Sequence, residues 1–370
     1  MNPFRYGRVV NEEYFCPRPE LIKTLHQNIL SAQNVVVQGE RRTGKTSLIW
    51  QACTSKKKSL ILYADFLEVK TTEDVVRRLL NALATYEQQA GLFQKLFKAL
   101  SHLKPQISID PYSGEPSFSF DVSSKATPDS VEHILDLYAT LSHRKPLVVV
   151  FDEFQDILNL VDHASLLACM RGKVQFHTKI PYIFSGSVRN RMEEIFTHQD
   201  SPFFKSALPL WVGAIDDDVF AHFLKNKFAL EKRKIDSNLM TKIFQLSEHN
   251  PGDTQQLCSA LWEITESGGV VSEDLLPEAM QVIFSREAKT YESLLVSITG
   301  IQLKCLVGLA RFETLSPQSS EFVRNTGLSG PASAYKALLR LEQIKIVYRT
   351  PQGYKFSNPY FKQWLLFKKY

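Results

Sequence analysis

One short stretch of the chain has the residue types and spacing that hold a chain of phosphates. Residues 39–46 read GERRTGKT and match the pattern Gly-x-x-x-x-Gly-Lys-Ser/Thr without a mismatch. The glycines let backbone N–H groups point at a phosphate, and the partial positive charge of a following helix adds to the attraction. Lys45 should reach the β- and γ-phosphates, and the Thr46 hydroxyl should bind Mg²⁺. The residues expected to bind the nucleotide here are Gly39, Glu40, Arg41, Arg42, Thr43, Gly44, Lys45, Thr46 and Ser47.

A pair of adjacent acids follows another apolar run. The segment PLVVVFDEFQDI, residues 146–157, reads as a buried strand that ends in Asp152 and Glu153. At the carboxyl end of a strand beside the phosphate loop, Asp152 can hold Mg²⁺ through water, and Glu153 can orient or deprotonate the attacking water. Adjacent acids also occur as simple helix caps. Together with the phosphate loop, however, they predict hydrolysis, with Glu153 and Lys45 as the catalytic residues.

The elements that must position these residues alternate between strand and helix. Such alternation indicates a parallel sheet with helices on both faces. Residues 104–122 instead alternate apolar and polar types around a Gly-Glu-Pro turn, which predicts a hairpin or an extended insertion. Buried strands are expected at 34–39, 59–66, 146–152 and 180–188, and helices at 19–32, 44–55, 72–90 and 128–143.

The second half of the chain has a different texture. From about residue 215 one helical pattern follows another without buried strands, which predicts an all-α domain. From about residue 295, three helices precede a hairpin, the order of a winged helix-turn-helix. The expected domains are therefore 1–214, 215–294 and 295–370.

Composition excludes several classes of protein. The chain has 370 residues, 44% hydrophobic and 22% charged, values typical of a globular protein with two or three domains. No apolar run approaches the roughly 20 residues that cross a bilayer, so no membrane association is expected. The first ten residues lack the apolar segment of a secretory signal. The five cysteines are scattered and form no CxxC, so a cytoplasmic protein without a disulfide framework or zinc site is expected.

Positive charge is concentrated in the expected winged helix. Residues 301–370 carry eleven Lys or Arg and three Glu, a net +8, whereas the whole chain is +5 and the remainder is therefore −3. Lys336 and Arg340 lie four apart on the expected recognition helix, and Arg349 and Lys355 flank the wing. This charge pattern is typical of a binder of duplex DNA through its phosphates. The alternative is a latch, in which the basic winged helix packs on the acidic remainder of the chain.

Six segments, in order, resemble the archaeal-type ATPases of the AAA+/STAND superfamily of P-loop NTPases, over nearly the whole chain. They are NPFRYG, FCPRPELIKTL, GERRTGKTSLIW, VVVFDEFQDI, IFSGSVRNRMEEIF and YKFSNPYFKQWLL. The resemblance implies an α/β fold, with a P-loop NTPase parallel sheet followed by a helical lid domain and a C-terminal winged helix-turn-helix. It also implies ATPase activity, with ATP or ADP and Mg²⁺ as the bound groups.

The resemblance assigns further residues near the phosphates. Arg18 takes the place of the arginine in the family's N-terminal element near the nucleotide. Ser187, or Ser185, takes the place of the polar sensor of the γ-phosphate. Arg189 is close enough in sequence to be a phosphate-sensing arginine, and the alternative is a surface arginine that starts a helix.

In two places this chain departs from the family's pattern. The family's helical domain places a Gly-x-Pro element over the base, and the matching stretch EHNPGDTQQL has His249 in place of glycine and Pro251 as the expected adenine contact. Where the family has an arginine that reaches a neighbouring subunit, this chain has Lys205. An arginine finger and the oligomeric state are therefore left open.

These observations favour an ATP-binding and ATP-hydrolysing molecular switch whose nucleotide state controls domain arrangement and the binding of a protein partner, with slow turnover in its absence. A second hypothesis is a DNA-associated AAA+ ATPase, similar to replication initiators or transposition regulators. A third is a nucleotide-bound scaffold with negligible turnover. A small-molecule kinase fits less well, because it rarely needs a helical domain and a winged helix.

Overall fold

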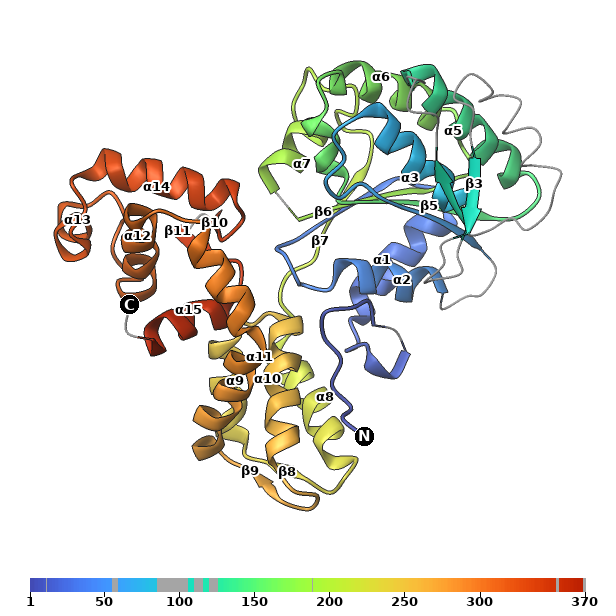
Figure 1. Cartoon of the computed structure of the whole chain (residues 1–370). Helices are drawn as coiled ribbons and strands as arrows, with labels where there is room; N and C mark the ends of the chain where they lie inside the picture. Colours follow the sequence, from blue (N-terminus) through green and yellow to red (C-terminus); the bar gives the residue numbers. More distant parts are fainter. Residues whose placement is uncertain are drawn as a thin grey trace. The chain divides into compact units, whose positions relative to one another are not determined.

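The computed structural model describes residues 1–10, 12–54, 59–84, 106–109, 116–119, 126–187, 189–350 and 353–368. The chain divides into two compact units (Figure 1). We call residues 11–213 the sheet unit, and residues 1–10 together with 214–370 the helical unit.

The sheet unit is built on five parallel strands in the order β2-β5-β6-β1-β7. The strands are β1 (Val35–Gln38), β2 (Leu60–Asp65), β5 (Leu147–Asp152), β6 (Tyr182–Gly186) and β7 (Leu208–Trp211). β5 and β6 are buried along their whole length, as expected for central strands of a parallel sheet covered on both faces. Four of these strands match the sequence prediction, whereas β7 at the sheet edge was not predicted.

Helices cover both faces of this sheet (Figure 1). α1 (Pro19–Leu30) and α2 (Lys45–Thr54) pack together on one face. On the other face α5 (Pro128–Ser142) packs against α3 (Thr72–Ala84) and α6 (His163–Val174). The described part of the unit also contains the short helices η1 (Glu12–Tyr14), η3 (Phe154–Asn159) and α7 (Arg189–Phe196).

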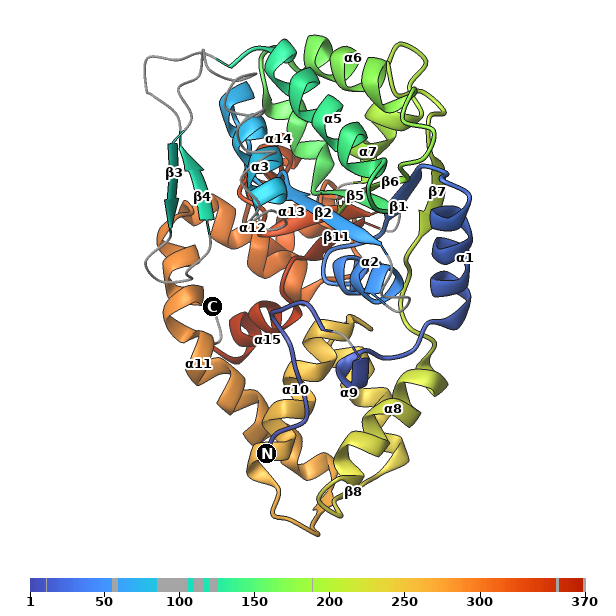
Figure 2. The same ribbon diagram turned by 90° about the vertical axis from the view of Figure 1, so that its right-hand side faces the viewer.

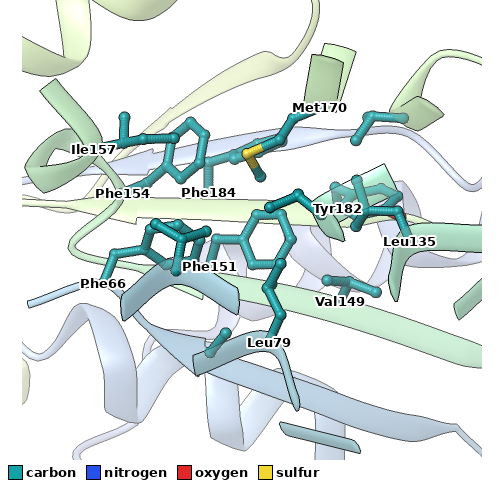
Figure 3. Packing of buried hydrophobic residues seen from close by; sticks show 14 of the residues in the cluster. Phe66, Leu79, Leu135, Val149, Phe151, Phe154, Ile157, Met170, Tyr182 and Phe184 are labelled. Carbon is teal, nitrogen blue, oxygen red and sulfur yellow. The ribbon is translucent and has the colours of Figure 1, made fainter. Parts of the chain in front are cut away.

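A cluster of aromatic rings forms the core beside the carboxyl ends of β5 and β6 (Figure 3). The Phe154 ring lies 4.9 Å from that of Phe184, and the Phe151 ring lies 5.2 Å from that of Phe66, centroid to centroid. All four side chains are buried. Because Phe151 and Phe154 flank the two adjacent acids, this packing fixes the turn that carries Asp152 and Glu153.

The segment expected as a hairpin or extended insertion contains an antiparallel pair. β3 (Gln106–Ile109) pairs with β4 (Pro116–Ser119), and Figure 2 shows the two strands side by side. The remainder of the 104–122 segment lies outside the described residues, as do residues 85–90 of the expected helix over 72–90.

The first part of the helical unit is a set of helices with one very short strand pair, which the sequence did not predict. The helices are α8 (Asp217–Ala229), α9 (Ser237–Leu246), α10 (Pro251–Ile264), η4 (Glu273–Leu275) and α11 (Leu276–Val296). The strands β8 (Lys234–Ile235) and β9 (Val270–Val271) pair in parallel.

The last part of the helical unit has the expected order of three helices and a hairpin. These are α12 (Gly300–Arg311), α13 (Ser320–Thr326), α14 (Pro331–Gln343), β10 (Val347–Thr350) and β11 (Gly353–Phe356). A further helix, α15 (Pro359–Phe367), ends the described chain, and its Phe361 and Trp364 rings lie 5.1 and 5.4 Å from that of Tyr291 on α11.

The N-terminal segment packs on the helical unit. The Phe4 ring lies 4.7 Å from that of Phe228 and 6.0 Å from that of Trp262, and Asn2 donates a hydrogen bond to the Ser259 hydroxyl. This differs from the expectation of a 1–214 domain that includes the N-terminus, because Phe4 finds its apolar partners on α8 and α10. α11 also runs through residue 296, so the expected boundary between 294 and 295 falls within its last turn.

Candidate nucleotide-binding site

The phosphate loop lies between the end of β1 and the start of α2. α2 begins at Lys45, directly after the loop. Arg42 and Gly44 both have positive φ, at 62° and 85°, the left-handed backbone that occurs in anion-binding turns. The loop therefore has the backbone geometry of an anion-binding turn that leads into a helix N-terminus.

Gly39 is required by a close approach of the backbone from β7. A Cβ added at Gly39 would lie 2.3 Å from the Val212 carbonyl oxygen. The Val212 N–H donates to the Gln38 carbonyl at 2.7 Å, so this part of the chain is held against the end of β1. Only glycine fits at this position without moving the backbone.

Lys45 is buried inside the loop. Its Nζ donates to the carbonyl oxygens of Gly39 at 3.0 Å and Glu40 at 2.8 Å. Burial lowers the pKa of Lys45, and the nearby Glu153 and Asp152 carboxylates oppose that shift. The ammonium is therefore held at the loop by backbone oxygens, where a phosphate would replace weak neutral partners with a charged one.

Asp152 and Thr46, which lie far apart in the sequence, are in contact. The Thr46 hydroxyl donates to Asp152 Oδ2 at 2.8 Å, and the Tyr63 hydroxyl donates to the same oxygen at 2.7 Å. The Glu153 N–H donates to Asp152 Oδ1 at 3.0 Å. A hydroxyl and a carboxylate are suitable ligands for Mg²⁺. Among the described residues no group of three or more His, Cys, Asp or Glu could hold a metal, so phosphates and water would have to complete the coordination.

Glu153 lies at a strained turn between β5 and η3. Its backbone is left-handed, with φ 47° and ψ 38°, a conformation that costs of order 1–3 kcal/mol for a residue other than glycine. Its Oε2 accepts hydrogen bonds from the Ser187 hydroxyl at 2.8 Å and from Gln155 Nε2 at 2.5 Å. The structure thus brings the predicted sensor Ser187 to the predicted base.

Gln155 also lies at this site, although the sequence did not predict it. Its side chain is 2% exposed, and Nε2 also lies 3.4 Å from Asp156 Oδ1. A Cβ at Gly186 would lie 2.4 Å from Gln155 Oε1, so glycine there makes room for the amide. The alternative sensor, Ser185, is fully buried, and its hydroxyl has no hydrogen-bond partner in the described part of the chain. Ser187 is therefore the better placed of the two serines to act on Glu153.

Arg18 supports the phosphate loop through the backbone. Its guanidinium donates to the Thr43 carbonyl at 2.9 Å and to the Gly213 carbonyl at 3.1 Å. The side chain is buried, and this burial lowers its pKa. The family resemblance placed Arg18 near the nucleotide, and the structure places it against the loop that is expected to hold the phosphates.

Replacing Arg18 with alanine should lower the free energy of unfolding by about 2–4 kcal/mol, because two partly buried carbonyls lose their donor and a buried side chain is removed. Urea unfolding measures this change. Arg144→Ala, a truncation of an exposed arginine in the same unit, is the matched control and should have little effect. An equal loss of unfolding free energy in both variants would show that Arg18 does not hold the loop.

The chain is similar to one known family over its last part and to solved structures over nearly its whole length. The family described as "Probable winged helix domain" matches residues 289–367. The Walker-type ATPase PAby2304 of Pyrococcus abyssi is similar in structure, with a TM-score of 0.66, 18% identity, and coverage of 98% of this chain and 99% of that chain. The chain has the fold of the AAA+ P-loop ATPases.

Two further structures with this AAA+ fold come from Aeropyrum pernix. The ORC1 protein in complex with DNA has a TM-score of 0.52 and 12% identity, and covers 96% of this chain and 94% of its own. The ORC2 protein with ADPNP and ADP has a TM-score of 0.51 and 14% identity, and covers 99% of both chains. A search of curated proteins found no match. The predicted fold class, a parallel sheet of the P-loop NTPases followed by helices and a winged helix, is confirmed.

The two residues that depart from the family pattern, His249 and Lys205, both have left-handed backbone. His249 has φ 55°, so it keeps the left-handed backbone that favours glycine at this position, and its Nδ1 lies 3.0 Å from Asp217 Oδ1. Pro251 is the first residue of α10 in the helical unit, where it is buried, and its contact with adenine stays a prediction. Lys205 also has positive φ, at 51°, and its Nζ lies 5.1 Å from the centre of the Phe204 ring. Arg189 begins α7, but its side chain lies outside the described residues.

The four basic residues proposed for the winged helix of this AAA+ fold do not share one surface. Lys336 and Arg340 are both exposed on α14, close to the exposed Tyr335 and Leu339. In the hairpin, Arg349 pairs with Tyr354 and Lys355 pairs with Tyr348. Neighbouring residues of a strand point to opposite faces, so Arg349 and Lys355 lie on opposite faces of the hairpin.

None of the described helices is long and apolar enough to cross a membrane.

Proposed function

We propose that this chain binds ATP with Mg²⁺ and hydrolyses it, and that it acts as a molecular switch for a protein partner. The observation that carries the proposal is the meeting of two distant motifs: the Thr46 hydroxyl of the phosphate loop donates to Asp152 at 2.8 Å, beside Glu153. Chance matches to either motif would not place these side chains in contact. The pair combines a phosphate-binding loop with a carboxylate that can act on water.

Each residue of the site has a separate task in this proposal. Lys45 binds the β- and γ-phosphates, while Thr46 and Asp152 hold the divalent cation. Mg²⁺ would neutralise charge on the phosphate oxygens. Glu153 orients or deprotonates the attacking water through Oε1, because both of its described donors, Ser187 and Gln155, reach Oε2.

We further propose that nucleotide state controls the arrangement of the sheet unit, residues 11–213, and the helical unit, residues 1–10 and 214–370. In this proposal Pro251 contacts the adenine, Arg189 senses phosphate, and the protein acts in the cytoplasm. Turnover is slow until the partner binds. The third hypothesis, a scaffold with negligible turnover, requires the same site but gives Glu153 no role in it.

A second candidate function is the handling of duplex DNA. Lys336 and Arg340 are exposed side by side on α14, within a segment of net +8 charge, and ORC1, which shares the fold, was solved in complex with DNA. A phosphate-backbone contact by these side chains would weaken steeply with salt. Nothing on α14 resembles a set of residues that reads base sequence.

The test is steady-state ATP hydrolysis with and without duplex DNA, at low and at physiological salt. The switch predicts slow turnover that DNA does not change. Stimulation by DNA that salt suppresses, and that is lost in Lys336→Gln/Arg340→Gln, would favour the DNA-handling function instead. The matched control is Lys23→Gln/Lys179→Gln, which removes two exposed charges from the sheet unit. Tight nucleotide binding without turnover under every condition would favour the scaffold.

A further inference from the structure

Tyr63 is a residue of β2 that neither sequence motif includes. β2 pairs in parallel with β5, and Tyr63 lies opposite Val150, two residues before Asp152. From there its hydroxyl reaches Asp152 Oδ2 at 2.7 Å. The neighbouring strand therefore contributes a side chain to the carboxylate proposed to hold the cation.

The Asp152 carboxylate is fixed from three directions. Oδ2 accepts from the hydroxyls of Tyr63 and Thr46, and Oδ1 accepts from the Glu153 N–H. The Asp152 side chain is 5% exposed, so water competes weakly for these positions. Of the three donors, Thr46 is also the proposed Mg²⁺ ligand, and the Glu153 N–H belongs to the strained turn. Tyr63 is therefore the one donor of the three whose only proposed task is to orient Asp152.

The phenol of Tyr63 is itself held in place. Its ring centroid lies 5.7 Å from that of Trp50 on α2, and its backbone is part of the sheet. The ring contact and the strand therefore hold the hydroxyl at the Asp152 carboxylate.

We infer that Tyr63 is a positioning residue for the divalent cation, which holds Asp152 in the orientation that binds Mg²⁺ through water and so sets the affinity for Mg²⁺. The inference rests on the proposed nucleotide site. Partners that orient a metal ligand typically change metal affinity by about 10- to 100-fold when removed. Because Asp152 would act through water and keeps two other donors, we expect a smaller effect, about 3- to 10-fold.

The test uses Tyr63→Phe, which keeps the ring and its contact with Trp50 and removes only the hydroxyl. Binding of fluorescent N-methylanthraniloyl-ADP to the full chain is measured in EDTA and then as a function of Mg²⁺ concentration. We expect the nucleotide affinity in EDTA to be unchanged. We expect the Mg²⁺ concentration that gives half of the maximal change in nucleotide binding to rise by about 3- to 10-fold. Melting temperatures in EDTA show that the variant is folded.

Tyr138→Phe is the matched control, because its buried hydroxyl donates to the Leu79 carbonyl at 2.8 Å in the same unit and touches no residue of the site. It should leave the Mg²⁺ dependence unchanged. An unchanged Mg²⁺ midpoint in Tyr63→Phe, or an equal shift in both variants, overturns the role of Tyr63 while the proposed function stands. A wild-type protein that binds no nucleotide with or without Mg²⁺ overturns the proposed function as well as this inference.

Discussion

Replacing Glu153 with glutamine should lower the rate of ATP hydrolysis by about 10²- to 10³-fold, because a general base typically contributes 10²- to 10⁴-fold. ATP binding should be retained. The glutamine amide oxygen can still accept from Ser187 and Gln155, which both donate to Glu153 Oε2, so the side chain should keep its place. Steady-state turnover measures the first effect, and equilibrium binding of ATP measures the second.

The matched control for this prediction is Glu194→Gln, the same chemical change at an exposed position of α7. It should turn over ATP at the wild-type rate. Ser187→Ala should have an intermediate effect, since Glu153 would keep the hydrogen bond from Gln155. Wild-type turnover by Glu153→Gln would show that another group activates the water, and the assignment of the base would be wrong.

Replacing Lys45 with methionine should weaken ATP binding by about 2 kcal/mol or more, at least about thirtyfold in Kd, because a charged partner of the phosphates is lost. The nucleotide-free protein should still fold. Burial lowers the pKa of Lys45, so the ammonium costs the folded state stability at neutral pH, and a methionine of similar volume avoids that cost. The variant also loses the hydrogen bonds from Lys45 to the carbonyls of Gly39 and Glu40, and this loss lowers its stability.

The stability cost of burying the Lys45 ammonium depends on pH. Since the pKa of Lys45 is lower in the folded than in the unfolded chain, the unfolded chain binds more protons between the two values, and wild-type stability rises with pH across that range. Lys45→Met lacks this contribution, so wild type should gain stability relative to the variant as the pH rises toward 10.5, the ordinary pKa of a lysine. Urea unfolding in EDTA measures the difference, with Lys23→Met, at an exposed lysine, as control. A difference that falls with pH would contradict the burial of a charged amine.

Much of the candidate site could be predicted because each of its two main motifs is a continuous stretch of sequence. The phosphate loop depends on the order of eight neighbouring residues, and the left-handed backbone of Gly44 is a local property that glycine supports. The Asp152–Glu153 pair could be placed because parallel strands bring their carboxyl ends to one edge of the sheet. The order of elements likewise predicted the winged helix in the last part of the chain.

Other parts of the site depend on which strand lies beside which, and the sequence alone did not reveal them. Tyr63 reads as one apolar residue of a buried strand until β2 pairs with β5 and brings its hydroxyl to Asp152. Gln155 follows Glu153 by two residues, but its role depends on the space that Gly186 leaves on β6. Arg18 could be placed near the nucleotide by resemblance, whereas its hold on the loop depends on Gly213, which lies after β7.

The residue types of the proposed site can be read from the sequence: a loop expected to bind phosphate, adjacent acids expected to act on a cation and on water, and a basic winged helix. Those properties follow from residue types at short spacing, which set local backbone geometry and charge. The orientation of the two acids depends on tertiary packing, because Tyr63 donates to Asp152, and Ser187 and Gln155 donate to Glu153. Tertiary packing also decided where the N-terminus lies, because Phe4 is buried by rings on two later helices. Orientation of this kind depends on hydrogen bonds and contacts between residues distant in sequence, and these exist only once the sheet and helices have packed.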